Sequence, residues 1–572
     1  MMYTKQWIAI LTAVMLTACG SSTDTPDTPV EPVTPTNPTQ PETDNTIYNG
    51  ITLPATWPIK RNAKSDIRRG MTPYYLTTKP TVIKVDVGRQ LFIDNFLIAS
   101  TTLKRTWHYA EYVVGNPVLS PDKDWERTGS SGAAFAAPFS DGVWYDEKDG
   151  LFKMWYMGGG GAYATSGAGV TCYAESADGM TWTKPSLNVV SGTNIVRRGA
   201  VRDASSVWID KQATNSSARY KMFEVAGGAG NWKYSYLTSS DGKTWRDQNA
   251  ASGKLADRST VFYNPFRSVW AWSMRHNVRV NSSDPYTVRA RDYMENADPV
   301  AGNKAAVADL NYFWCGPWPS EQKHPTYKNN DGSPGIYNID AMPYESIMLG
   351  LFTIWQGPEN DVAEKDGVIK RNQVMLGYSR DGFSWYREDM NAFLPVNDDK
   401  TAWNNGNVQS TVGSPLIVGD KLYFYVSGRR LENGKEITST GLATLRRDGF
   451  ASMSGSGELT TETLKFKGEY FFVNAAVRGD MKVEILDANG KSIAGFTKDD
   501  CLSVTGDGTK LQVTWKNNTT LKSLSGQNIK VKFYLTDADL YAFWISDYAT
   551  GESRGYTAGG GPGLNALGTD TK

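Results

Sequence analysis

The chain has 572 residues, which is room for two or three domains with cores of their own, and it carries 60 basic and 60 acidic residues. This balance gives no electrostatic footprint for a nucleic acid, so we expect none as a partner. The aromatic content is 12%, with 19 Trp and 29 Tyr, and we expect most of these rings to pack between sheets and the others to offer platforms for sugar rings.

The first residues have the pattern of a bacterial lipoprotein signal. A basic start over residues 1–5 precedes an apolar core over 7–15 that is too short to span a bilayer, and Leu16-Thr17-Ala18-Cys19 then matches the lipoprotein cleavage box. The resemblance implies cleavage before Cys19 and a lipid on its thiol, with an ordinary secretory signal as the alternative. Because no Asp follows Cys19, we expect a lipid anchor in the outer membrane of a bacterial envelope, periplasmic or surface-exposed.

The composition then divides the remaining chain. After the signal peptide of residues 1–19, residues 20–46 are almost wholly Ser, Thr, Pro, Asp and Glu, which predicts a disordered linker. We expect residues 47–455 to form the catalytic domain, including an N-terminal segment with a first strand and turn at 90–98. Residues 456–572 are expected to form a second domain.

A short phrase repeats through the middle of the chain. Ser-x-Asp-Gly-x-(Thr/Ser)-Trp occurs at 176–182, 239–245 and 379–385, and a degenerate copy ends at Phe450. Neighbouring copies are 63 or 67 positions apart, and the middle gap of 140 holds two units. A period of this size, with an Asp-Gly turn after an aromatic-rich strand, is typical of one β-sheet blade per unit. We therefore predict an all-β protein, a five-bladed β-propeller followed by a β-sandwich, in which the Asp-Gly phrases are turns.

Each unit contains an expected hairpin. The paired segments are 142–145 with 151–156, 206–209 with 220–224, 260–263 with 269–272, 338–342 with 347–355, and 415–418 with 421–425. Past residue 456 the phrase disappears, and short alternating strands predict the sandwich; examples are 481–486, 511–515 and 529–535.

Cysteine and histidine are scarce. The three cysteines after Cys19 are far apart, no Cys-x-x-Cys spacing occurs and the chain has 3 His, so we expect neither a metal site nor a cofactor. Cys172 and Cys315 can pair in an oxidising compartment, although nothing in the sequence demonstrates it.

The repeat also aligns acidic residues. Asp203 lies five positions before Trp208, and Asp257 lies five positions before Phe262, so each begins the inner strand of its blade. The starts of inner strands surround the central funnel of a propeller, where crowded carboxylates push one another's pKa values apart and so separate a general acid from a base. We therefore predict that Asp203 and Asp257 are catalytic. The alternative for each is a structural role in capping a strand.

Two further acids are candidates for catalysis. Asp340 enters the fourth blade slightly out of register, and Glu345 lies in a hairpin, a position that favours a structural role. We expect five more residues to bind substrate through charge or hydrogen bonds: Arg202, Arg258, Asp141, Asn407 and Gln409.

Arg202-Asp203 before an inner strand, followed one blade later by an acidic residue, resembles the five-bladed propeller glycosidases of the invertase/levanase and arabinanase/xylosidase groups. Segments 468–475 and 540–544 are similar to the appended sandwich of the fructan-cleaving members. In these families an Asp from the first blade, an Asp from the second and a Glu from the third carry the reaction. Asp203 matches the second of them, Asp257 stands where the Glu would be, and no Trp-x-Asn-Asp-Pro motif marks the first.

The resemblance implies an extracellular glycoside hydrolase that acts on a polysaccharide or oligosaccharide as a monomer. Three alternatives stay open. One is a surface protein that binds glycans without cleaving them, and a second is a sialidase-like hydrolase. The third is a polysaccharide lyase, which needs a Tyr or His beside a charge-neutralising group.

Overall fold

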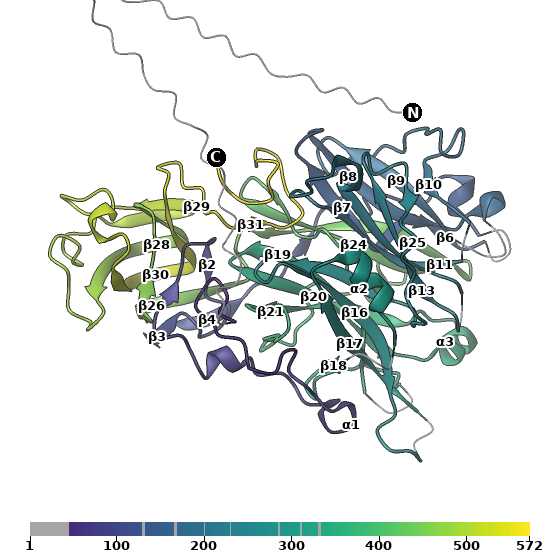
Figure 1. Ribbon diagram of the computed structural model, residues 1–572, viewed down its shortest axis with the longest axis horizontal. Coiled ribbons are helices and arrows are strands. Elements are labelled where there is room, and N and C mark those ends of the chain that lie inside the picture. Colours follow the sequence, from purple (N-terminus) through teal and green to yellow (C-terminus); the bar gives the residue numbers. More distant parts are fainter. Residues whose placement is uncertain are drawn as a thin grey trace, which may run out of the picture. The chain divides into compact units, whose positions relative to one another are not determined.

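The computed structural model describes residues 45–572 except 129–131, 165–168, 200, 229, 284–285, 309–311 and 330–332. Strands dominate these ranges (Figure 1), and the helices are short: α1 (Ala63–Asp66), α2 (Pro299–Ala305) and α3 (Asn360–Asp366). None of the helices in the described ranges has the length and apolar character needed to cross a membrane. The predictions for Cys19 and for most of the linker fall outside the described residues.

Three four-stranded antiparallel sheets follow one another and form the first three blades. The first blade contains β7 (Ala137–Asp146), β8 (Leu151–Gly158), β9 (Val170–Ser176) and β10 (Ile195–Arg197). The second contains β11 (Arg202–Ile209), β12 (Tyr220–Ala226), β13 (Lys233–Ser239) and β14 (Arg246–Asp247). The third contains β15 (Thr260–Asn264), β16 (Val269–Val278), β17 (Val288–Asn296) and β18 (Tyr312–Cys315).

The fourth and fifth blades share one sheet, because β21 and β22 pair in parallel. The fourth blade contains β19 (Gly335–Glu345), β20 (Ile347–Gly357) and β21 (Arg371–Ser379). The fifth contains β22 (Asn407–Gln409), β23 (Leu416–Val418), β24 (Lys421–Glu432) and β25 (Lys435–Arg446). All five expected hairpins are present.

The ring is closed by strands that precede the first blade in the chain. β5 (Glu111–Tyr112) pairs with β25 in antiparallel fashion, and β6 (Ala134–Phe135) pairs with it in parallel. β7 contacts both β11 of the second blade and β24 of the fifth. The prediction of a five-bladed propeller is therefore confirmed.

The Asp-Gly phrases form turns after the third strand of the first, second and fourth blades. Asp178 Oδ1 accepts hydrogen bonds from the backbone N–H groups of Met180 (2.8 Å) and Thr181 (2.7 Å), while Ser176 Oγ accepts one from Gly179 N (2.9 Å). The same bonds recur in the other two copies. Gly179 has a φ of 75°, a conformation that glycine adopts without strain.

Each of these turns also bonds to the preceding blade. The Tyr425 hydroxyl donates to Gly179 O (2.7 Å), Trp155 Nε1 donates to Gly242 O (2.6 Å), and Asn264 Nδ2 donates to Asp381 O (2.8 Å). The first of these bonds joins the fifth blade to the first. The repeated phrase therefore holds neighbouring blades together at the ends of the strands where these turns lie.

The second domain is built on two long strands, β28 (Tyr470–Asp487) and β30 (Asn528–Ser546), which pair with each other with register shifts along their length. Three more C-terminal strands complete this part of the sheet: β26 (Ala451–Thr461), β27 (Leu464–Lys465) and β29 (Val504–Val513). A last strand, β31 (Tyr556–Thr557), returns to the propeller and pairs with β19.

The N-terminal segment differs from our expectation, which placed it with the propeller. Four of its strands join the C-terminal sheet: β1 (Ile83–Lys84), β2 (Gln90–Leu91), β3 (Ile98–Thr101) and β4 (Lys104–Trp107). Phe92 and Phe96 are buried in the same core as Phe471 and Phe543. Asn45, which lies inside the predicted linker, accepts a hydrogen bond from Leu53 N through its carbonyl oxygen (2.9 Å).

Candidate functional site

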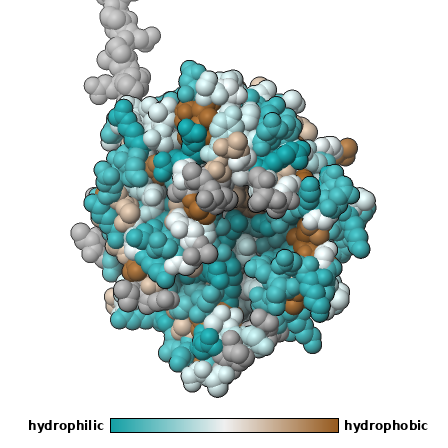
Figure 2. All heavy atoms as spheres, turned by 90° about the vertical axis from the view of Figure 1, so that its right-hand side faces the viewer, coloured by the Kyte–Doolittle hydropathy of each residue, from teal (hydrophilic) through white to brown (hydrophobic). Residues whose placement is uncertain are grey.

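Four of the expected acids lie in or just before the inner strands, Asp203 and Asp257 at their starts and Asp141 and Asp340 near their middles. Asp141 lies in β7, Asp203 is the second residue of β11, Asp257 precedes β15, and Asp340 lies in β19. Figure 2 shows the side on which α3 and β6 lie in Figure 1; its surface is mostly hydrophilic and is hollowed near the centre.

Asp340 lies at the axis of the ring, because its carboxylate contacts blades that are not neighbours. Its Oδ2 accepts hydrogen bonds from Ser410 Oγ (2.6 Å) beside β22, from Asn338 Nδ2 (2.9 Å), and from Ser140 Oγ (3.3 Å) in the first blade. Its Oδ1 is buried without a hydrogen-bond partner among the described residues. Burial raises the pKa of Asp340 to about 7, although the three donors act in the opposite direction, so this carboxyl group can hold a proton at neutral pH.

Asp141 is a second carboxyl group with a raised pKa. Its Oδ1 accepts hydrogen bonds from Arg202 Nη2 (2.5 Å) and Ser205 N (2.9 Å), and its buried Oδ2 has no partner within the described part of the chain. Burial raises the pKa to about 6 against the effect of Arg202. Arg202, which we expected to bind substrate, is itself buried and also donates to Thr171 Oγ1 (2.7 Å). The structure places it as a partner that orients Asp141.

Asp203 and Asp257, the pair that sequence analysis favoured for catalysis, are both ion-paired with arginine. Asp203 accepts a hydrogen bond from Arg258 N (2.6 Å), and its Oδ1 lies 3.2 Å from Arg258 Nε. Asp257 pairs with Arg275 and lies 3.6 Å from Arg289 Nη2. Burial alone would raise the pKa of Asp257, but the arginines lower it to about 2. It therefore stays ionised at neutral pH and is poorly suited to donate a proton.

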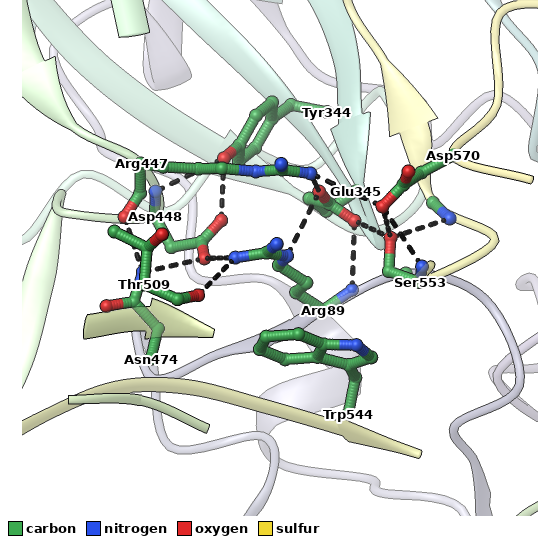
Figure 3. A network of polar contacts seen from close by, with 12 residues as sticks. Arg89, Tyr344, Glu345, Arg447, Asp448, Asn474, Thr509, Trp544, Ser553 and Asp570 are labelled. Carbon is green, nitrogen blue, oxygen red and sulfur yellow. Dashed lines mark hydrogen bonds and ion pairs between the residues drawn. The ribbon is translucent and has the colours of Figure 1, made fainter. Parts of the chain in front are cut away.

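Glu345 does not lie with the funnel acids. It is fully buried where the second domain meets the fourth blade (Figure 3), and its Oε2 accepts hydrogen bonds from Ser553 Oγ (2.6 Å) and Arg89 N (3.1 Å). Arg447 Nη2 donates to its other oxygen at 3.0 Å. These partners give Glu345 a structural role, because a residue in a tight hairpin turn lies at the far end of its strands from the funnel.

Asn407 and Gln409, two other expected substrate-binding residues, are buried in β22. Asn407 Nδ2 donates to Lys370 O (2.9 Å), and Gln409 Nε2 donates to Asn407 Oδ1 (2.9 Å). These bonds fix the segment that carries Ser410, the closest donor to Asp340. The two side chains therefore support the site.

Around Tyr337, near the start of β19, the structure gathers positive charge that sequence analysis identified only in part. Four cations, hereafter the cation cluster, act on the phenol of Tyr337: Arg258, Arg289, Lys370 and Arg429. The guanidinium carbon of Arg289 lies 4.0 Å from the centroid of the Tyr337 ring. Burial would raise the pKa of Tyr337, but the cation cluster lowers it below its ordinary value.

Phe139 lies between two members of the cation cluster. The guanidinium carbons of Arg258 and Arg429 are 4.8 and 5.0 Å from the centroid of its ring. Phe139 and Arg258 also have φ angles of 52° and 54°, in the left-handed region that bulky residues rarely adopt. Such strain is concentrated at functional sites, where the surrounding structure maintains it.

One signal in the sequence pointed toward the cation cluster. Arg289 and Arg291 alternate in β17, and strand alternation places them on one face. Lys370 and Arg429 come from distant parts of the chain, so their approach to Arg289 follows only from the closed ring. Within the described ranges, no group of three or more metal-ligating side chains occurs, and Cys172, Cys315 and Cys501 are buried free thiols.

No known family model matches the chain, and no curated protein matches it in sequence. Solved structures similar to it include a β-1,2-mannobiose phosphorylase from Listeria innocua, at 12% identity over 59% of this chain and 96% of that one, with a TM-score of 0.37. A fructofuranosidase from Schwanniomyces occidentalis matches at 11% identity over 74% of this chain and 99% of that one, with a TM-score of 0.34. An N-acetylgalactosamine deacetylase from F. plautii matches at 10% identity over 58% and 97%, with a TM-score of 0.36. No activity is carried over from these likenesses, and the fold is defined by the sheets of this chain.

Proposed function

We propose that the chain is a glycoside hydrolase that cleaves a polysaccharide or oligosaccharide at the axis of the propeller. The observation that carries this proposal is the pair Asp340 and Asp141, two buried carboxyl groups with pKa values of about 7 and 6. Ser140, the residue before Asp141 in β7, donates to Asp340, so the carboxyl group of Asp340 contacts the strand that carries Asp141.

The two carboxyl groups suit the two roles that glycoside hydrolysis requires. Asp340, with a pKa of about 7, keeps a large protonated fraction at neutral pH and protonates the leaving oxygen as the general acid. Asp141 is ionised above pH 6 and has an oxygen without a partner among the described residues, so it acts as base or nucleophile. Asp203, ion-paired with Arg258, orients the sugar. In this assignment Asp257 is no longer a catalytic residue, because its lowered pKa makes it a poor group for proton transfer.

Release of reducing sugar from a panel of plant and algal glycans tests the proposal directly. We expect the full chain to release reducing ends from at least one glycan, and Asp340→Asn to bind that glycan without releasing them. Binding by the native chain without any release would contradict the proposal and favour a protein that only binds glycans.

Tyr337 favours a second candidate, cleavage by β-elimination. A phenol with a lowered pKa beside several cations fits a base that takes the proton next to a sugar carboxylate, while the cations neutralise that carboxylate. The base takes the proton of the C–H bond, a carbon–carbon double bond forms as the C–O bond to the leaving group breaks, and the leaving oxygen takes a proton. The product then has an unsaturated ring that absorbs ultraviolet light. Reducing ends with this absorbance would establish elimination, and reducing ends without it would establish hydrolysis.

We also propose that a lipid on Cys19 anchors the protein in the outer membrane, and that it acts there as a monomer on carbohydrate. The support is the cleavage box in the sequence. Cys19→Ser should release the protein into the soluble fraction, and continued partition with membranes would contradict the anchor.

A further inference from the structure

The cation cluster has few acidic partners. Asp203 is the partner of Arg258 (3.2 Å), while Asp257 is shared between Arg289 (3.6 Å) and Arg275. At the edge of the cluster, Arg429 Nη1 lies 3.1 Å from Glu436. Lys370 instead lies over the ring of Trp355, with Nζ 5.2 Å from its centroid. Buried positive charge with so few carboxylates nearby is costly without a further anion.

The arginines of the cluster also hold hydrogen-bond donors that the described residues do not use. Arg258 Nη1, Arg289 Nε and Arg429 Nε are buried and donate no hydrogen bond to any described residue. A buried donor without an acceptor costs roughly 1–3 kcal/mol, and more when it is charged. The side chains of Arg258, Arg289 and Arg429 are only 11%, 7% and 14% exposed, so water reaches them poorly.

Two members of the cluster are held below their ordinary pKa, whereas Asp203 and Tyr337 raise the pKa of Arg258 against the effect of burial. Burial, together with Arg275 and Arg258, lowers the pKa of Arg289 to about 10. Burial, Arg289 and Arg429 lower the pKa of Lys370 as well. An anion placed among these groups would relieve the repulsion between the cations and accept their unused hydrogen bonds. A neutral sugar would accept hydrogen bonds but would not relieve the repulsion.

We propose that the cation cluster binds an oxyanion carried by a sugar unit of the substrate, either the carboxylate of a uronic acid or a sulfate ester. Guanidinium groups bind both kinds of oxyanion in paired, charge-assisted hydrogen bonds. The rings of Tyr337 and Phe139 flank these groups and offer faces against which the sugar ring packs. The substrate is then an acidic glycan. This identity of the substrate rests on the proposed function, but the binding of the oxyanion does not.

Calorimetric titration of the full chain carrying Asp340→Asn separates binding from cleavage. The probes are uronate oligosaccharides, sulfated oligosaccharides, a neutral oligosaccharide of matched length and inorganic phosphate. We expect one acidic class to bind roughly 10–100-fold more tightly than the neutral probe, with an affinity that falls as salt is added. The class that binds identifies the oxyanion.

Two substitutions test the residues. Arg289→Gln and Arg429→Gln should each weaken the binding of the acidic probe by roughly 10–100-fold and leave binding of the neutral probe unchanged. The matched control is Arg430→Gln, the next residue in β24, which pairs with the exposed Glu432 and should keep the native affinity within about twofold. Thermal unfolding of each variant checks that it is folded.

Equal binding of acidic and neutral probes would overturn the inference, and so would binding of phosphate alone. Unchanged affinity in both arginine variants would overturn the assignment of the site. If acidic probes bind as expected but the native chain cleaves none of them, the proposed function fails and the inference stands.

Discussion

Asp178 at the turn end of a propeller blade and Asp141 and Asp340 at the funnel end use their carboxyl groups in opposite ways. At the turn end, the backbone N–H groups of Thr181 and Met180 hold the pKa of Asp178 near 2, so its carboxylate stays ionised and fixes a turn. At the funnel end, burial raises the pKa values of Asp141 and Asp340 to about 6 and 7. Asp178 thus holds its turn with a permanent charge, whereas Asp141 and Asp340 can exchange protons near neutral pH. The contrast belongs to these residues, because burial raises the pKa of Asp381 in another turn and arginines lower that of Asp257 near the funnel.

The residues of the turns repeat along the chain, whereas the surroundings of the funnel residues do not. The hydrogen bonds around Asp178 recur around Asp241 and Asp381, whereas the aspartates of the inner strands have different partners from one blade to the next. Repeated residues therefore mark what the fold needs.

The largest expected effect comes from removing the funnel carboxyl groups. Asp340→Asn and Asp141→Asn should each lower kcat by roughly 10²–10⁴ because general acid–base catalysis contributes that much. The double variant should lose much less than the product of the two, since the groups act together. Steady-state kinetics on a cleaved glycan measures these losses.

The control for this prediction lies at the other end of the blade. Asp178→Asn removes a carboxylate of a turn and should leave kcat within a few-fold. A large loss of kcat in Asp178→Asn, or native turnover in both funnel variants, would contradict the division between the two ends.

Breaking the junction between the domains should affect stability rather than chemistry. Glu345→Ala removes the acceptor of hydrogen bonds from Arg89 N and Arg447, leaves both arginines without that partner, and should cost about 3–5 kcal/mol of unfolding free energy. Denaturant titration measures the loss. Activity per folded molecule should stay native, and a selective loss of kcat without destabilisation would return Glu345 to the list of catalytic candidates.

At alkaline pH, Asp340→Asn and Asp178→Asn should change the free energy of unfolding in opposite directions. The pKa of Asp340 is raised from 3.8 to about 7, so the folded state binds its proton more tightly and loses stability as pH rises toward 7. Asp340→Asn should therefore stabilise the protein at pH 8, by on the order of 2–4 kcal/mol. The lowered pKa of Asp178 contributes stability above pH 4, so Asp178→Asn should destabilise slightly at pH 8. Denaturant titrations at pH 5 and 8 compare the two, and a loss in both variants would contradict the account.

The smallest effect is expected from the linker. Deleting residues 20–44 should leave the melting temperature and kcat unchanged, because the composition of this segment cannot build a core. A drop of several degrees in the melting temperature would show that the segment packs on the domain.

The blades could be predicted from sequence because their information is local. Hairpins such as 142–156 and the turn phrase at Asp178 each lie within a short stretch of chain. The place of β2 could not be predicted, because a two-residue strand carries little pattern and pairs with β30 more than 400 positions away. Its partner follows from the shared core, which includes Phe92 and Phe543.

The candidate site was predicted in part for the same reason. Register within a blade identified Asp203 and Asp257 as residues near the axis, but the protonation of a carboxyl group depends on its neighbours in space. Asp257 has arginines beside it, and Asp340 has only neutral donors. The neutral surroundings of Asp340, which favour a proton donor, depend on Ser140 and Ser410, and these residues belong to other blades.

The pH dependence of kcat/KM tests the central claim most directly. If Asp141 must be ionised and Asp340 protonated, kcat/KM should rise through a pKa of about 6, fall through one of about 7, and peak between them. In Asp340→Asn the residual activity should lose the alkaline limb and keep the acidic one. A profile that is flat from pH 5 to 8, or one whose alkaline limb survives in Asp340→Asn, would contradict the account.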